Sequence, residues 1–71
     1  MNRDAVDVRG DEEARFLLLV HRTTGAVLGA AYRCSDGWWI GQDVTGKPRR
    51  CYPPAGAEDP RMHIANQLIN P

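Results

Sequence analysis

The hydrophobic residues of this chain gather in four consecutive strand-like runs, which glycine-containing segments separate. The runs cover residues 15–22, 26–34, 38–44 and 47–52. The segments between them are residues 23–25, 35–37 and 45–46. Short runs of strand-forming residues joined by such turns are typical of successive β-hairpins. The pattern therefore predicts a four-stranded antiparallel meander.

The periodicity becomes helical near the end of the chain. Asp59 and Pro60 are the residue types preferred at the N-cap and the first position of a helix. Apolar residues then recur at helical spacing, at Ile64, Ala65, Leu68 and Ile69. We therefore expect a single α+β domain of order ββββα over residues 15–71, with the helix packed on one face of the sheet.

Residues 1–14 precede this pattern and carry two basic and five acidic residues. We expect them to form a flexible, acidic N-terminal arm. Val6 and Val8 alternate with polar residues, so they are candidates for a short edge strand.

Hairpin geometry predicts which side chains share a face. A three-residue loop that ends in glycine pairs the residues on either side of it. Applied to the first two turns, this rule collects one face: Phe16, Leu18, Val20, Leu28, Ala30, Tyr32, Cys34, Trp38 and Ile40. We expect the helix to cover this heavier face. The arrangement in which the helix packs on the small residues Gly29, Ala31 and Gly41 stays open, and it would make the heavier face an interface.

The last turn offers two registers. A three-residue loop would place Arg50 opposite Ile40, which we expect in the core. We therefore favour a two-residue turn at Thr45 and Gly46, with Trp39 opposite Tyr52.

Trp38 and Trp39 are adjacent, and they are the only tryptophans. Successive side chains of a strand point to opposite faces, so one indole lies on each face. With Trp38 in the predicted core, Trp39 falls on the helix-free face opposite Arg33. Trp, Tyr and Arg dominate the energetics of protein interfaces. We therefore predict a partner-binding surface made of Trp39, Arg33, Tyr52, Leu17, Leu19 and Arg50.

Composition limits the functional classes. The 71 residues suffice for one small domain, and chains of this size often gain stability from a second copy. Nine basic and nine acidic residues balance, so net charge suggests no nucleic acid, membrane or acidic substrate. We found no signal peptide or membrane-spanning stretch and expect a cytoplasmic protein, and the residue usage suits a bacterial or phage genome.

Residues that carry chemistry are sparse. Cys34 and Cys51 fall on one predicted face with a strand between them, too far apart to bridge, so we expect free thiols. Neither they nor His21 and His63 have metal-ligand spacing. The only serine, Ser35, lies in a turn. We therefore expect no enzyme, metal or cofactor, but a small interaction module that binds a partner or itself, such as a phage or mobile-element inhibitor or adaptor.

DNA binding by the sheet is the alternative. Basic residues on and beside the sheet would contact phosphates or bases: Arg15, Arg33, Lys47, Arg49 and Arg50. Residues 37–69 are loosely similar to AP2-type and integrase arm-binding domains, in which a small antiparallel sheet backed by a helix reads DNA. The similarity rests on generic hairpin and helix patterns and assigns no residue role.

Overall fold

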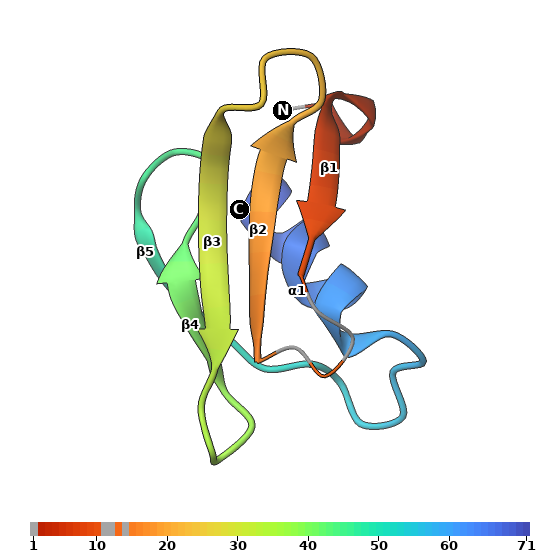
Figure 1. Cartoon of the computed structure of the whole chain (residues 1–71). Helices are drawn as coiled ribbons and strands as arrows, with labels where there is room; N and C mark the ends of the chain where they lie inside the picture. The colour runs from red at the N-terminus through yellow and green to blue at the C-terminus, as the bar shows by residue number, and fades with distance from the viewer. Residues whose placement is uncertain (1, 11–12, 14) are drawn as a thin grey trace.

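The computed structural model describes residues 2–10, 13 and 15–71, which form an antiparallel sheet with one helix behind it (Figure 1). The strands follow chain order across the sheet: β1 Val6–Arg9, β2 Phe16–His21, β3 Val27–Arg33, β4 Trp39–Gln42 and β5 Pro48–Cys51. The helix α1 is Pro60–Ile69, and a single 3-10 turn, Arg3–Ala5, precedes β1. The α+β class is confirmed, but the count of four strands is wrong because β1 adds a fifth.

Strand β1 comes from the segment that we assigned to a flexible arm. It pairs with β2, so that Val6 lies opposite His21 and Val8 opposite Leu19. The Val6 side chain is fully buried, and burial of apolar surface favours an ordered edge strand here. The arm prediction for residues 1, 11, 12 and 14 lies outside the described residues.

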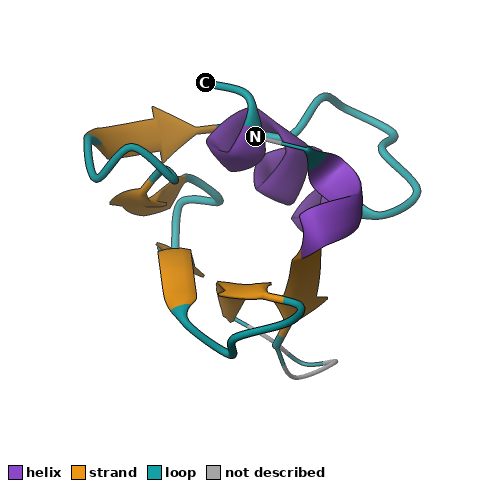
Figure 2. Cartoon of the chain, turned by 90° about the horizontal axis from the view of Figure 1, so that it is seen from above, coloured by secondary structure: helices purple, strands orange, loops and turns teal. Residues whose placement is uncertain are grey.

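The sheet curves around α1, as the view from above shows (Figure 2). Its concave face and the helix enclose the core: Val6, Leu17, Leu19, Ala31, Trp39, Ile64, Ala65, Leu68 and Ile69. The helix therefore covers the opposite face from the one that we predicted. Of the nine residues assigned to the core face, only Val20 is fully buried.

Curvature explains why the helix packs on the lighter face. A β-carbon at Gly41 would lie 1.9 Å from the Ala30 carbonyl oxygen, and one at Gly29 would lie 2.8 Å from the Gln42 carbonyl oxygen. Only glycine allows backbones to approach this closely. Small residues at the centre of the concave face let the sheet bend around a helix, and the bulky residues remain on the convex face.

The predicted register is confirmed in the middle of the sheet. Phe16 lies opposite Tyr32, and Tyr32 lies opposite Ile40. The first hairpin differs from prediction because its loop has four residues, 22–25, with the His21 N–H donating to the Ala26 carbonyl at 2.8 Å. The extra residue forms a bulge at Leu28, which packs against the core.

The last hairpin has the register that we rejected, with Arg50 opposite Ile40. The rejection assumed that Ile40 is in the core. Because Ile40 is 36% exposed on the convex face, the Arg50 guanidinium beside it stays in contact with water.

The helix forms as predicted. The Asp59 carboxylate accepts a hydrogen bond from the Met62 N–H at 3.3 Å, and Pro60 occupies the first turn. Ile64, Ala65, Leu68 and Ile69 are its buried residues. Among the described residues, no helix has the length and apolar character needed to cross a membrane.

Candidate protein interface

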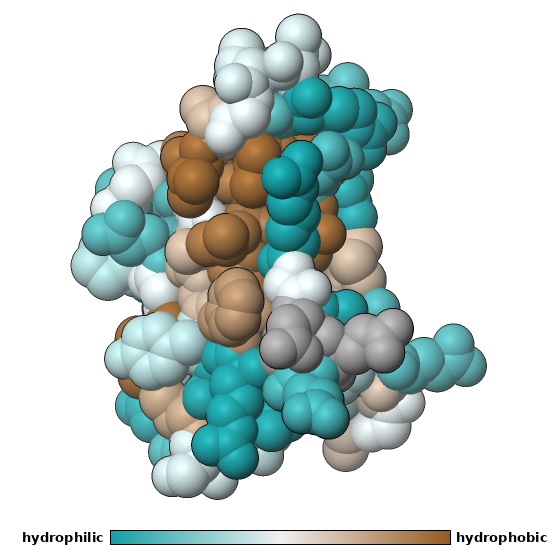
Figure 3. Space-filling model, viewed as in Figure 1, coloured by the Kyte–Doolittle hydropathy of each residue, from teal (hydrophilic) through white to brown (hydrophobic). Residues whose placement is uncertain are grey.

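The convex, helix-free face of the sheet carries a row of large side chains. Phe16, Tyr32, Ile40 and Arg50 lie opposite one another in turn across β2, β3, β4 and β5. Phe16 is 46% exposed and Tyr32 is 55% exposed. Apolar side chains gather over β2 and β3 on this side (Figure 3). We call the surface formed by Phe16, Leu18, Ala30, Tyr32, Ile40 and Gln42 the open face.

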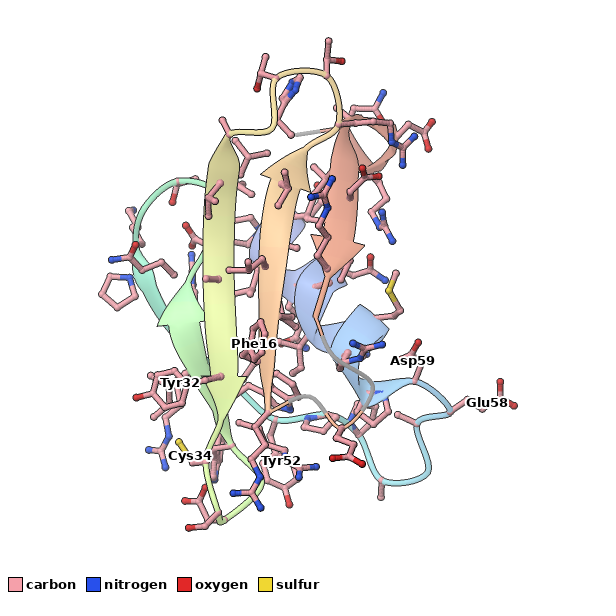
Figure 4. All side chains as sticks on the ribbon, viewed as in Figure 1. Phe16, Tyr32, Cys34, Tyr52, Glu58 and Asp59 are labelled. Carbon is pink, nitrogen blue, oxygen red and sulfur yellow. The ribbon has the colours of Figure 1, made fainter. Side chains whose placement is uncertain are left out.

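A groove of about 340 Å³ crosses the open face. Its walls are the six side chains of the open face and the adjoining backbone of β2, β3 and β4, and they carry no charge. The small Ala30 lines the groove together with Phe16 and Tyr32, which Figure 4 labels. The groove can therefore receive an apolar or aromatic side chain from a partner, by shape and desolvation rather than by charge.

An aromatic and cationic cluster adjoins the row at Ile40. The Arg50 guanidinium lies 4.4 Å from the centroid of the Trp38 ring, in a cation–π contact. The Trp38 and Tyr52 rings meet edge to face with centroids 5.0 Å apart. One indole does lie on each face, as predicted, but the roles are exchanged: Trp38 is on the exposed side and Trp39 is in the core.

This exchange corrects half of the predicted partner-binding surface. Leu17, Leu19 and Trp39 are buried under α1, so they are not available to a partner. Arg33 and Arg50 are exposed, and Tyr52 is 52% exposed, but only Arg50 borders the open face. The predicted Arg33–Trp39 contact is correct as a cross-strand pair, although the cation–π contact that the structure records is the one between Arg50 and Trp38.

The basic residues of the DNA-binding alternative do not lie on one surface. Arg33 shares the concave side with Trp39, whereas Arg50 lies on the convex side with Ile40. The Arg49 Nε atom donates to the Asp43 carboxylate at 2.6 Å. Lys47 is exposed in the last hairpin, whereas Arg15 directly precedes β2 and its carbonyl accepts a hydrogen bond from the Arg33 N–H.

Asp43 is a buried carboxylate directly after β4, and we assigned it no role from the sequence. One oxygen accepts the Thr45 N–H at 2.8 Å, the Lys47 N–H at 3.2 Å and the Thr45 hydroxyl. The Thr45 hydroxyl, followed by Arg49, holds the pKa of Asp43 well below its usual range. An aspartate two residues before Thr-Gly was the available signal, because such residues stabilise turns. Asp43 therefore fixes the β4–β5 hairpin.

The cysteines are both free, as predicted, with β4 between β3 and β5, but they do not share one face as we expected. Cys51 lies opposite Trp39 and packs against the core, and burial raises the pKa of its thiol. Cys34 follows β3, and its N–H donates a hydrogen bond to the Trp38 carbonyl at 2.7 Å. In the described part of the chain, no three His, Cys, Asp or Glu residues come together to hold a metal ion.

No protein-family model matches the chain, and neither does a curated protein or a solved structure. The open face and its neighbouring contacts are therefore the basis for assigning a function.

Proposed function

We propose that this chain is a protein-interaction module, which forms a homodimer through its open face. The observation that carries the proposal is the row of Phe16, Tyr32 and Ile40, three large side chains that lie side by side and are 36–55% exposed. Contiguous apolar patches of this kind on a folded domain usually mark an interface. The proposed activity is binding rather than catalysis.

A second copy suits this surface. In a two-fold symmetric dimer the same patch meets itself, so it must offer both a protrusion and a hollow. The open face offers both, since the Phe16 and Tyr32 rings border the groove over Ala30. A ring of one copy would enter the groove of the other.

Charge does not oppose this association. The chain has a formal net charge of zero, so two copies repel each other only weakly at a distance. The groove walls are uncharged, and no charged group must lose its water when they are covered. Arg50 lies at the end of the row, stacked on Trp38, where polar groups normally form the rim of an interface.

Size gives an independent reason. A domain of this length buries only about 60% of the surface of its unfolded chain. The core described above uses a single ten-residue helix on one face of the sheet. Covering the second face with another copy would add apolar burial that the monomer lacks.

Light scattering across a range of protein concentrations, without and with duplex DNA at two salt concentrations, tests the proposal. We expect the mass of two chains at the higher concentrations and no response to DNA. The mass of one chain at every concentration would contradict homodimerisation. Salt-sensitive DNA binding that Arg33→Ala and Arg50→Ala abolish would replace the proposal with the DNA-binding alternative.

A further inference from the structure

A second cavity, of about 500 Å³, lies on the other side of the sheet from the open face, where the beginning of α1 meets the beginning of β4. Arg33, Trp39, Tyr52, Pro53 and Pro60 contribute to its walls. Figure 4 shows Tyr52 and Asp59, which also line the cavity, at the same end of the molecule. The volume is within the range of sites that hold small ligands, about 300–1,000 Å³.

Trp39 lines this cavity, and its indole carries an unsatisfied donor. Trp39 is only 2% exposed, and its Nε1 atom has no hydrogen-bond partner among the described residues. Trp39 belongs to β4, which pairs with β3 on one side and β5 on the other. Its side chain projects onto the concave face, where the cavity lies. A buried N–H group without an acceptor is unfavourable, so such a group calls for an explanation.

Two further donors accompany the indole. Arg33 lies directly opposite Trp39 and therefore projects to the same side, where it lines the cavity. The Tyr52 hydroxyl is beside Gly37, 3.1 Å from the position that a β-carbon there would take. Indole and guanidinium groups can only donate, so the complementary ligand group must accept several hydrogen bonds at once.

The acidic residues in the walls have interactions of their own. The Asp59 carboxylate accepts the Met62 N–H as the N-cap of α1. Glu13 and Arg61 both line the cavity, and both have interactions of their own. A carboxylate from a ligand would suit the donors, because it is planar, offers about four acceptor sites and pairs with arginine in a two-pronged geometry.

We infer that this cavity binds a carboxylate attached to an apolar or aromatic body. Arg33 pairs with the carboxylate, and the Trp39 and Tyr52 donors complete its hydrogen bonds. The rings of Trp39, Tyr52, Pro53 and Pro60 provide the apolar walls. A small aromatic acid and the C-terminal residue of a peptide share this chemistry.

The test follows the Trp39 indole N–H in ¹H–¹⁵N correlation spectra, with the two indole signals assigned by the Trp38→Phe variant. Benzoate is the first probe, and benzamide, which has the same ring without the charge, is its matched control. Gly-Gly-Phe with a free and with an amidated C-terminus distinguishes a peptide terminus from a free acid. We expect a saturable shift of the Trp39 signal with benzoate or the free peptide and none with the amides.

Arg33→Gln is the matched variant, because Arg33 is exposed and its loss should leave the fold intact. We expect it to weaken carboxylate binding about tenfold or more. Three results would each overturn the inference: no saturation at a dissociation constant of about 10 mM or below, equal shifts with acid and amide, or unchanged binding by Arg33→Gln. Repeating the titration on Tyr32→Ser, which alters only the open face, separates this result from the fate of the homodimer.

Discussion

Removing the Tyr32 ring should weaken the homodimer strongly and leave the monomer folded. An aromatic side chain buries about 150–250 Å² when it is fully covered, so the 55% exposed part of Tyr32 leaves roughly 100 Å² for a partner to cover. At about 25 cal/mol per Å², this contact contributes about 2.5 kcal/mol per copy. A symmetric dimer contains it twice, so the upper estimate for Tyr32→Ser is about 5 kcal/mol.

Association also has entropic costs that make burial an incomplete guide to affinity. Even half of the upper estimate corresponds to a dissociation constant weaker by nearly two powers of ten, at about 1.4 kcal/mol per tenfold. Within the monomer, Tyr32 lies opposite Phe16 and Ile40 on an exposed face of the sheet. Losing its cross-strand contacts should cost about 1 kcal/mol of folding stability or less.

Sedimentation equilibrium measures the dissociation constant of each variant, and urea unfolding checks the fold. Tyr52→Ser is the matched control, because Tyr52 is 52% exposed but lies outside the row of Phe16, Tyr32 and Ile40. We expect Tyr52→Ser to dimerise nearly as well as the unmodified chain. Equal dissociation constants for Tyr32→Ser and the unmodified chain would refute the assignment of the open face as the interface.

Three further predictions concern the fold. Trp39→Ala should lower the free energy of unfolding by about 3–5 kcal/mol in urea titrations, because it leaves a cavity in the core. Trp38→Ala should have a clearly smaller effect. The reverse order would show that the two faces are exchanged. Gly41→Ala should prevent folding, as judged by circular dichroism, because its β-carbon has no room beside the neighbouring strand, and a folded variant would contradict the close approach of β3 and β4. Asp43→Asn should destabilise the protein at neutral pH and lose this effect as the pH falls below about 4, because a carboxylate with a lowered folded-state pKa stabilises only while it is ionised. The urea midpoint measured between pH 7 and pH 2, with exposed Asp36→Asn as control, tests this, and a difference between Asp43→Asn and the unmodified chain that stays the same from pH 5 to pH 2 would contradict it.

Local sequence signals predicted the elements of this fold well. Glycine at the end of each hairpin loop and the Asp59-Pro60 helix start are short-range features, and the structure shows positive φ at Gly25, Gly37 and Gly46 and a capped helix. Alternation then predicted which side chains share a face between Phe16 and Ile40. The bulge at Leu28 was not predictable in this way, because it depends on whether the first loop has three or four residues.

Which face of the sheet the helix covers could not be predicted from the alternation of side chains along the strands. Both faces contain large apolar residues and one tryptophan each, so a ranking by bulk favoured the wrong one. The decisive feature is the strip of Gly29, Ala31 and Gly41, which permits curvature and so makes its own face concave. The arrangement that we kept open for this strip is the observed one, and it leaves Phe16 and Tyr32 exposed.

The central claim is that two chains meet through the open face. An isotope-filtered NOE experiment on a mixture of labelled and unlabelled chains tests it most directly, because only contacts between chains give signals. The account predicts cross-peaks from the Tyr32 and Phe16 rings of one chain to Ile40, Leu18 or Ala30 of the other. Intermolecular cross-peaks from α1 or the β1 edge instead would contradict the claim. So would the absence of intermolecular cross-peaks at concentrations where light scattering shows a dimer.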